Sequence, residues 1–323
     1  MLPLVDLRHV DSRQLEPLLA EETAEWQTEL DWDFSGAAHQ IRRLAGPRAL
    51  AGVALMDKGE VAGYGYTVVE YPKGLIGDVY VRPGWRGAET ETRLFKVLLD
   101  ALTGMDGVER VESQLMLTPP RDVRGLTSER FIQLFERRLL MRELRVPVGP
   151  AGMNAEERFR FTGWEPAVWD SLPRLIMRSY EGHIDGQIND QYATVDGAEK
   201  FLRSLLDNAG CGEFFRPGSL FAIDRRTEWM SGAILTSLVT PETAHVTQLC
   251  VVPEMQGSGL GRELLRRSLA ALAVCGVKRV TLTVTASNTK ANRIYDTSGF
   301  SEMRRFCAIV WSAAGRVSNS RWA

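Results

Sequence analysis

The sequence is poor in cysteine, has almost no net charge and contains no long apolar run. Its four cysteines form no C-x-x-C pair and have no histidine at ligand spacing, which argues against a disulfide framework and a structural zinc site. No stretch approaches the roughly 20 apolar residues of a membrane helix, and charged residues come too early for a signal peptide. A net charge of −2 offers no basic field to nucleic acid. These absences predict a cytoplasmic protein that has no metal cofactor. They also predict that the protein contacts neither membranes nor nucleic acid.

The sequence does contain one long-range internal repeat. A short apolar strand, a proline, two residues, a long polar side chain and a glycine occur twice, ending at Gly87 and at Gly257, which are 170 positions apart. Each copy continues with a helical stretch, at residues 91–102 and 261–273, and then with Gly-Val-x-Arg-Val. Chance is unlikely to supply this whole ordered series at a nearly constant offset. A weaker match aligns Phe135 with a later tyrosine.

The repeat predicts two tandem domains, residues 1–152 and 153–323, joined near residues 147–154, where Pro, Gly and Ala cluster. This agrees with a length of 323 residues, which is about two domains. Apolar periodicity predicts helices at 12–29, 35–44, 91–102, 128–141, 172–183, 198–209 and 261–273, and strands at 49–56, 61–70, 75–81, 108–116, 159–165, 219–224, 232–238, 244–252, 279–285 and 304–311. Helices and strands together indicate a mixed α/β (α+β) layer structure.

A glycine-rich loop in the second copy carries the clearest functional signal. The strand before it ends at Pro253, and Gly257, Gly259 and Gly261 lead into a helix. The first amides of a helix lack partners and carry the positive end of its dipole, and glycine lets a phosphate approach the backbone. The loop therefore predicts an anion site. Arg262 excludes both a Walker loop, which needs Gly-Lys, and a dinucleotide fingerprint, which needs a third glycine at that place.

Two motifs together resemble the GNAT family of N-acetyltransferases. The pattern Val-x-Pro-x-x-Gln-Gly-x-Gly-x-Gly-Arg at residues 251–262 resembles the family's acyl-CoA-binding signature, and Asn-x-x-Ala-x-x-x-Tyr-x-x-x-Gly-Phe at residues 288–300 resembles its second signature. The resemblance implies, in each domain, a mixed, mostly antiparallel sheet with helices on both faces. It also implies that the strand before the loop splays from its neighbour. The tandem arrangement is similar to that of mycothiol synthase-like acetyltransferases, although no motif assigns their acceptor.

The resemblance implies the cosubstrate, acetyl-CoA, and the residues that would hold it. The backbone of Cys250 and Val251 would bind the pantetheine arm, and one of their amides would polarise the thioester carbonyl. The pyrophosphate would be held by the loop, which comprises Gln256, Gly257, Ser258, Gly259, Leu260, Gly261 and Arg262. Asn288 would contact the pantetheine amide region, and Tyr295 would protonate the departing thiolate. The spacing of these two residues independently puts them on one helix face.

The sequence leaves the general base open. Thr247 and Gln248 occupy the strand where many family members carry a carboxylate, and neither side chain is a base near neutral pH. His245, Glu242 and Glu254 are the local candidates. Proton removal through a water chain, or attack by an amine that is already neutral, remains an equal alternative.

The first copy lacks the features of a catalytic domain. Two glutamates, Glu89 and Glu91, replace the second and third loop glycines, so carboxylates and Cβ atoms would oppose a pyrophosphate. Phe135, at the place of the tyrosine in the weaker match, has no hydroxyl. We therefore expect a structural or substrate-framing domain, in which Trp85 and Arg86 line a groove.

Two functions follow from these residues. The first is an enzyme that transfers an acetyl group from acetyl-CoA to a primary amine of a small-molecule or peptide acceptor, by direct attack in a ternary complex. The second is a non-catalytic acyl-CoA-binding or regulatory module, which the missing strand carboxylate favours. An acidic excess on the early helices of the second domain suits a cationic amine, but a solvated face explains it equally well. The sequence assigns neither the acceptor nor the oligomeric state.

Overall fold

The structure, a computed structural model, describes residues 2–128, 131–145, 155–207 and 212–313. The chain divides into two compact units, Met1–Arg137 with Arg305–Ala323, and Arg138–Arg304. Each unit has a sheet with helices on both faces. None of the helices in these ranges is long and apolar enough to cross a membrane.

In the first unit the strands follow the order β1-β2-β3-β4-β5-β13. Their bounds are β1 Leu4–Asp6, β2 Gly52–Asp57, β3 Glu60–Glu70, β4 Lys73–Val81, β5 Arg110–Leu115 and β13 Ser301–Ser312. Neighbours run antiparallel except for the parallel pair β4 and β5. β13 enters this sheet with its second half, from Cys307 opposite Leu115 to Ser312 opposite Arg110. The second half of the last strand therefore belongs to the sheet of the first unit, whereas Ser301–Arg304 belong to the second unit.

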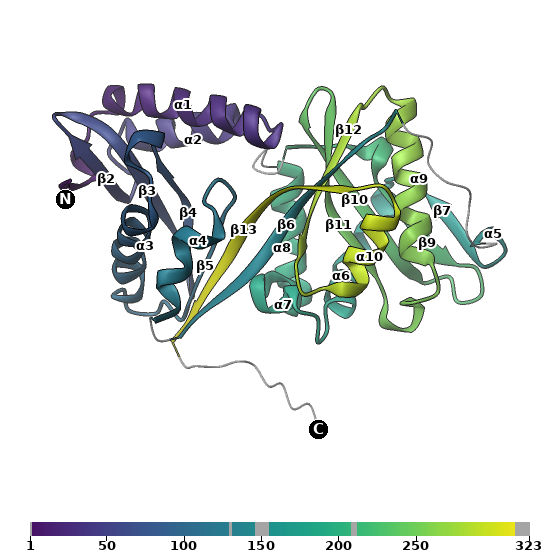
Figure 1. Cartoon of the computed structure of the whole chain (residues 1–323). Coiled ribbons are helices and arrows are strands. Elements are labelled where there is room, and N and C mark those ends of the chain that lie inside the picture. The colour runs from purple at the N-terminus through teal and green to yellow at the C-terminus, as the bar shows by residue number, and fades with distance from the viewer. Residues whose placement is uncertain (1, 129–130, 146–154, 208–211, 314–323) are drawn as a thin grey trace. The chain divides into compact units, whose positions relative to one another are not determined.

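Helices cover both faces of this first sheet. α1 (Ser12–Leu30) and α2 (Ser35–Ala45) lie on one face, and α3 (Ala88–Thr103) and α4 (Pro120–Val123) lie on the other (Figure 1). The apolar side chains of α3 recur at helical spacing and are buried against the strands; they are Leu94, Phe95, Leu98, Leu99 and Leu102.

In the second unit the strand order is β6-β12-β11-β10-β9-β7, with β8 paired to β10. Their bounds are β6 Ile132–Glu143, β7 Phe159–Thr162, β8 Glu213–Phe214, β9 Leu220–Asp224, β10 Met230–Thr240, β11 Thr243–Val251 and β12 Arg279–Thr285. β11 and β12 are parallel, whereas the pairs from β11 to β7 are antiparallel.

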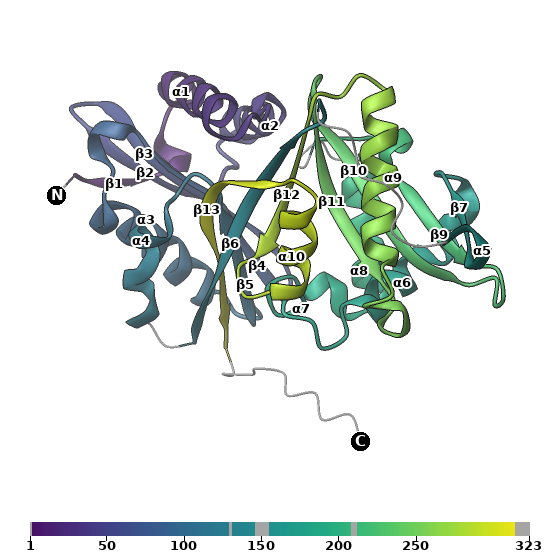
Figure 2. The same cartoon turned by 45° about the vertical axis from the view of Figure 1, so that its right-hand side comes forward.

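The helices of the second unit form two layers around this sheet. Their bounds are α5 Ala155–Arg158, α6 Leu172–Ser179, α7 Asp185–Ile188, α8 Val195–Asp207, α9 Leu260–Val274 and α10 Thr289–Thr297. α9 and α10 cover one face, and α6 and α8 cover the other (Figure 2). Alternation along β10 feeds both layers, because Ile234 packs with α9 while Ala233 and Leu235 pack with α6.

The predicted mixed α/β class, with a mostly antiparallel sheet and helices on both faces of each unit, is confirmed. Most predicted elements lie within a few residues of the observed ones, and β12 has the predicted bounds. The predicted helix at 128–141 is wrong, because this segment contains strand β6. Its mixed charged and apolar sequence fits both periods, and pairing with other strands decides the outcome.

This correction removes the match between Phe135 and Tyr295. Phe135 lies on strand β6, whereas Tyr295 lies on helix α10. The short helix α4 follows β5 in the first unit as α10 follows β12 in the second. At the offset of 169 that joins Gly107 to Gly276, position 295 corresponds to Leu126, which likewise has no hydroxyl.

The predicted linker at 147–154, and the boundary between 152 and 153, lie outside the described residues. The compact units also differ from the predicted domains at the end of the chain, because hydrogen bonding to β5 assigns residues from Arg305 onward to the first unit. The division of the sequence into two copies, 1–152 and 153–323, stays a prediction.

Candidate active site

β11 parts from β12 just before the glycine-rich loop. The two parallel strands pair only as far as Val246 and Leu282. β11 nevertheless continues to Val251 and β12 to Thr285, and all of these residues are described. One edge of β11 is therefore open at its C-terminal end, which is the splayed arrangement that the family resemblance implies. An unpaired strand edge offers backbone N–H and C=O groups to a ligand.

Alternation along β11 decides which backbone groups face this open edge. The Val252 N–H donates to the Ser231 carbonyl at the start of β10, at 3.0 Å. In an antiparallel ladder every second residue turns its backbone to the same neighbour. Cys250 therefore faces β10, whereas Leu249 and Val251 face the open edge. This geometry favours Val251 over Cys250 for backbone contacts to pantetheine.

The loop at residues 256–262 presents the N-terminus of α9. Gly257 and Gly259 have φ values of +79° and +92°, in the region that favours glycine. α9 begins at Leu260, and its N-cap, Gly259, has no side chain that could cap the helix. A Cβ added at Gly257 would meet no atom within 4 Å. The loop therefore combines backbone donors, the positive end of a helix dipole and open space, as an anion site requires.

The polar side chains of the loop hold it in place. Gln256 donates from Nε2 to the Val251 carbonyl at 3.2 Å, and the Ser258 hydroxyl donates to a carbonyl three residues earlier at 2.6 Å. Arg262 donates from its guanidinium to the Thr297 hydroxyl on α10 at 2.9 Å. These contacts tie the loop to the end of β11 and to the helix that carries Tyr295.

α10 carries Asn288 and Tyr295. Asn288 is its N-cap, and the side-chain Oδ1 accepts a hydrogen bond from the Ala291 N–H at 3.1 Å. Tyr295 is buried, with its ring edge-on to Phe300 at a centroid distance of 5.9 Å. Seven positions separate the two residues, which is close to two helical turns, so their side chains lie on one side of the helix.

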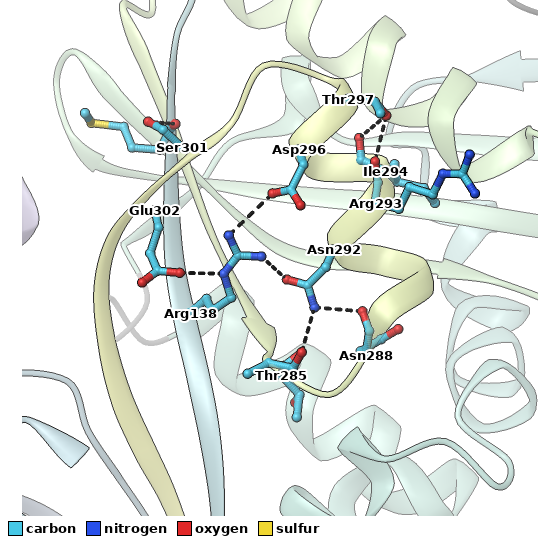
Figure 3. A network of polar contacts seen from close by, with 12 residues as sticks. Arg138, Thr285, Asn288, Asn292, Arg293, Ile294, Asp296, Thr297, Ser301 and Glu302 are labelled. Carbon is cyan, nitrogen blue, oxygen red and sulfur yellow. Dashed lines mark hydrogen bonds and ion pairs between the residues drawn. The ribbon is translucent and has the colours of Figure 1, made fainter. Parts of the chain in front are cut away.

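Arg138 of β6 fixes this helix through a polar network (Figure 3). Its guanidinium donates to the Asn292 amide oxygen, to Glu302 at 2.7 Å and to Asp296 at 3.4 Å. The Asn292 amide group donates in turn to the carbonyls of Asn288 at 2.7 Å and of Thr285 at 3.0 Å. Because the Asn292 side chain is buried, this chain of bonds sets where α10 starts relative to the open end of β12.

Tyr180, a residue that the sequence did not single out, lies at the centre of the other face. Its hydroxyl donates to Gln248 Oε1 at 2.6 Å, and its ring stacks on Tyr192 at 4.4 Å. Burial raises the pKa of this phenol well above its ordinary value. Tyr180 packs against the buried cluster of this face, which contains Cys250.

His183, also missed from the sequence, contacts Asn288 directly. Its Nε2 lies 3.1 Å from Asn288 Nδ2. The following Asp185 accepts a hydrogen bond from the Thr285 hydroxyl at the end of β12. His183 and Asn288 are 105 positions apart, and a single histidine outside any motif gives no sequence signal of such a contact.

The predicted base candidates have other partners. Nδ1 of His245, which is buried on β11, lies 2.9 Å from the Thr281 hydroxyl in the paired part of β11 and β12. Glu242 forms an ion pair with Lys278, and Glu254 forms one with Arg178. Both carboxylates are about half exposed, which is typical of surface ion pairs.

The corresponding loop of the first unit closes on itself. α3 begins beside Gly87, whose N–H donates to the Glu91 carboxylate at 2.8 Å. Arg86 forms two hydrogen bonds of 2.5 and 2.6 Å to Glu25 of α1 and is therefore engaged within this unit. Trp85 is partly exposed. A carboxylate of the chain thus occupies the helix N-terminus that an anion would need.

No group of three or more His, Cys, Asp or Glu side chains within the described ranges is placed to hold a metal ion.

Several known proteins with similar sequences or structures are named as acetyltransferases. Residues 189–308 match the acetyltransferase (GNAT) domain. A mycothiol acetyltransferase from Thermobispora bispora is 28% identical over 259 residues, which is 80% of this chain and 82% of that protein. A GCN5-related N-acetyltransferase from Sphaerobacter thermophilus has a similar fold, with a TM-score of 0.67 over 97% of both chains at 16% identity.

A tandem GNAT protein from the clavulanic acid biosynthesis pathway superposes with a TM-score of 0.54. The match covers 97% of this chain and 98% of that one at 15% identity, so it concerns the fold alone. Residues 189–308 of the chain are therefore similar to the acetyltransferase (GNAT) domain, and the splayed strands and the glycine-rich loop lie within this range.

Proposed function

We propose that the second unit transfers an acetyl group from acetyl-CoA to a primary amine, by direct attack in a ternary complex. The observation that carries this proposal is the open edge of β11 running directly into the exposed N-terminus of α9. The open strand edge suits the amide-rich pantetheine arm, and the helix N-terminus suits the pyrophosphate. The strand edge and the helix N-terminus follow one another along the chain, as a long thioester cosubstrate requires.

In this proposal the chain's own residues bind and polarise acetyl-CoA. The loop at 256–262 holds the pyrophosphate, and the Val251 backbone holds pantetheine, with Cys250 beside it. An N–H of the open edge donates to the thioester carbonyl and stabilises the negative charge that develops on its oxygen. Asn288 orients the pantetheine amide region, and the Tyr295 hydroxyl donates its proton to the departing thiolate.

The acceptor in this proposal is a small molecule or a peptide with a primary amine. The named function of the Thermobispora relative makes a mycothiol-related amine one candidate. We also propose the cytoplasm as the location, which is supported by three described cysteines that are all unpaired, Cys250, Cys275 and Cys307.

The test is release of free thiol from acetyl-CoA in the presence of thiol-free amines: glucosamine, aminoglycosides and short peptides. Turnover with at least one amine is expected, and it should depend on that amine's concentration. Tight binding of CoA without turnover on any acceptor would instead support the second candidate, a non-catalytic acyl-CoA-binding module. Gln248 favours that alternative, because it stands where many relatives have a carboxylate and accepts a hydrogen bond from Tyr180.

A further inference from the structure

The strand before the glycine-rich loop has a bulge at the same place in both copies. The pairing register between β10 and β11 skips Thr247, and the register between β3 and β4 skips Gly77. These two residues are 170 positions apart, which is the offset that joins the two loops. The copies therefore share a feature of the strand as well as a pattern in the loop.

The strand of the first unit also has an open edge. β4 and β5 are paired only as far as Leu75, which lies opposite Glu112. β4 nevertheless continues to Val81 and β5 to Leu115, and all of these residues are described. An unpaired edge therefore leads into the loop of the first unit, as it does in the second.

Alternation along β4 shows which backbone groups face this edge. The Arg82 N–H donates to a carbonyl of β3 at 2.9 Å. Because every second residue of an antiparallel ladder turns its backbone to the same neighbour, Val79 and Val81 face the open edge. At the offset of 170 they correspond to Leu249 and Val251, which face the open edge of β11.

The last carbonyl of the edge has the same kind of partner in both units. Arg86 donates from Nε to the Val81 carbonyl at 2.6 Å, and Gln256 donates from Nε2 to the Val251 carbonyl at 3.2 Å. Bulge, open edge and bonded carbonyl, at residues 77–86 and 247–256, form a common strand frame. In the second unit this frame is the part that is proposed to bind the acyl end of acetyl-CoA.

The two frames differ at one backbone N–H group. In the first unit the Val79 N–H donates to Asp78 Oδ1 at 2.7 Å. The residue that corresponds to Asp78 is Gln248, and its Oε1 accepts from the Tyr180 hydroxyl at 2.6 Å instead. No side chain in the described ranges accepts from the Leu249 N–H. A carboxylate therefore takes, in the first unit, the N–H group that is open in the second.

A second carboxylate takes the N–H groups at the helix start. Glu91 accepts from the Gly87 N–H at 2.8 Å, and both Asp78 and Glu91 are buried. Carboxylate oxygens accept hydrogen bonds from backbone N–H groups, as thioester and phosphate oxygens do. Each carboxylate thus gives its N–H donor the kind of partner that a bound acyl-CoA would give.

We infer that the first unit is an acyl-CoA site filled by its own side chains, which rests on the proposed binding of acetyl-CoA by the second unit. Asp78 Oδ1 takes the place of the thioester carbonyl oxygen, and the Glu91 carboxylate takes the place of the pyrophosphate. The emptied site would accept an acyl-CoA thioester, and the filled site excludes it. Glu22 of α1 lies beside Asp78 and accepts from the Tyr64 hydroxyl at 2.8 Å, so the carboxylate is held within the layers of this unit.

The first test empties the site by grafting residues from the second copy. The variant D78Q/E89G/E91G copies the residues at positions 248, 259 and 261. The variant E89G/E91G keeps Asp78 and is the matched control. Thermal unfolding of both full-length variants checks that they fold.

The backbone amide of Val79, followed by NMR during titration with acetyl-CoA, reports the first unit separately from the second. In the wild type this amide is expected not to respond. The triple variant is expected to bind acetyl-CoA at the first unit at least about tenfold more tightly than the control, since one hydrogen bond donor is released. Equal affinities of the two variants, or a response of Val79 in the wild type, would overturn the inference.

The second test uses the wild type and does not depend on how the grafted variants fold. Burial raises the pKa of Asp78 to about 6, and the groups that face it are Glu22, Tyr64 and Tyr66. The Val79 amide is expected to shift as Asp78 titrates, because its acceptor changes charge. D78N should abolish this response and E22Q should keep it. A Val79 amide that does not respond to pH in the wild type contradicts the contact with Asp78.

The amides of Leu249 and Gly257 separate this inference from the proposed function. Both are expected to respond to acetyl-CoA in the wild type. If they do not respond, the proposed function fails, and the pH response of Val79 still decides whether Asp78 occupies the edge of the first unit. If they respond and the triple variant binds no better than its control, the proposed function stands and the inference about the first unit fails.

Discussion

At the scale of single residues, the second unit places the His183 imidazole against the Asn288 amide, and the Tyr295 phenol lies about two helical turns further along α10. Tyr295 and Asn288 come from α10, and His183 comes from the segment after α6. The first two follow from motif spacing. His183 does not, because a contact across 105 positions depends on how α6, β12 and α10 pack.

Removing the Tyr295 hydroxyl tests the proposed acid. Y295F keeps the ring that packs against Phe300, so folding should be unaffected. The departing thiolate would lose its proton donor, and kcat is expected to fall by about 10²-fold with the dissociation constant of acetyl-CoA unchanged. Steady-state thiol release and a binding titration on the same samples measure the two quantities. Full retention of kcat would refute the acid role.

A buried acid pair in the first unit predicts a pH-dependent stability. Glu22 of α1 accepts from the Tyr64 hydroxyl at 2.8 Å and lies beside Asp78 of β4. Burial, followed by the charge of Asp78, raises the pKa of Glu22 well above its ordinary value, and burial raises the pKa of Asp78 to about 6.

Carboxyls with raised pKa values hold protons in the folded state that the unfolded chain releases. Their contribution to stability is therefore complete below about pH 4 and is lost as pH rises through about 6. The first unit of the wild type is expected to melt several degrees lower at about pH 8 than at about pH 5. E22Q, which keeps a donor but cannot titrate, should show a smaller shift in calorimetry. An equal shift in both proteins would exclude the pair as its cause.

At the scale of elements, the N-termini of α9 and α3 follow equivalent loops of the two copies but differ in whether a side chain of the protein neutralises them. In the second unit α9 starts behind glycines, and the side chain that reaches its first N–H is the neutral hydroxyl of Ser258, 3.4 Å from the Leu260 nitrogen. In the first unit α3 starts beside Gly87, and Glu91 supplies the negative charge from within the chain. The same dipole is left open in one copy and is satisfied internally in the other.

Exchanging this feature is expected to convert the open loop into the closed one. A Cβ at Gly261 would meet only Val251 Cγ2 at 3.6 Å, which is ordinary contact, so G261E should fold. Its carboxylate would lie where Glu91 lies in the first unit and would compete with the pyrophosphate. Affinity for CoA should fall by at least about tenfold, and G261A, the size control, should weaken binding far less. Equal affinities of G261E and G261A for CoA would show that charge is irrelevant at this position.

The Arg138 network predicts that β6 holds α10 in place. R138M would leave the buried oxygen of Asn292 without its donor, at an expected cost of about 1–3 kcal/mol in the free energy of unfolding. Because α10 carries Asn288 and Tyr295, kcat should fall as well. Urea unfolding and thiol release measure the two effects. R138K keeps the positive charge but lacks the branched guanidinium, so its stability and kcat should lie between those of R138M and the wild type. A methionine variant with native stability and kcat would exclude this role.

The elements also show where sequence reasoning stops. β12 and the helix after the glycine loop follow from period and turn chemistry alone. The strand β6 cannot be predicted in this way, because the spacing of its charged residues also fits one face of a helix. In the structure these residues form ion pairs with β13, Arg138 with Glu302 and Glu136 with Arg305. Cross-strand partners far along the chain determined its structure, and no local window contains them.

At the scale of the whole molecule, the two units have the same layers, but within the described residues the glycine-rich loop is open in the second unit and is closed by Glu91 in the first. Titration of the full chain with CoA is therefore expected to give one site per chain, with G261E abolishing most of the heat. Two comparable sites would contradict the conclusion that Glu91 closes the first loop.

The pairing of β13 with β5 has a consequence for biosynthesis. The first unit is encoded almost entirely at the start of the chain, yet its sheet includes residues Cys307–Ser312. Until the ribosome has passed that point, the edge of β5 that later pairs with β13 has no partner strand. The unit translated first can therefore finish folding only after the second has been synthesised, reversing the usual N-to-C order.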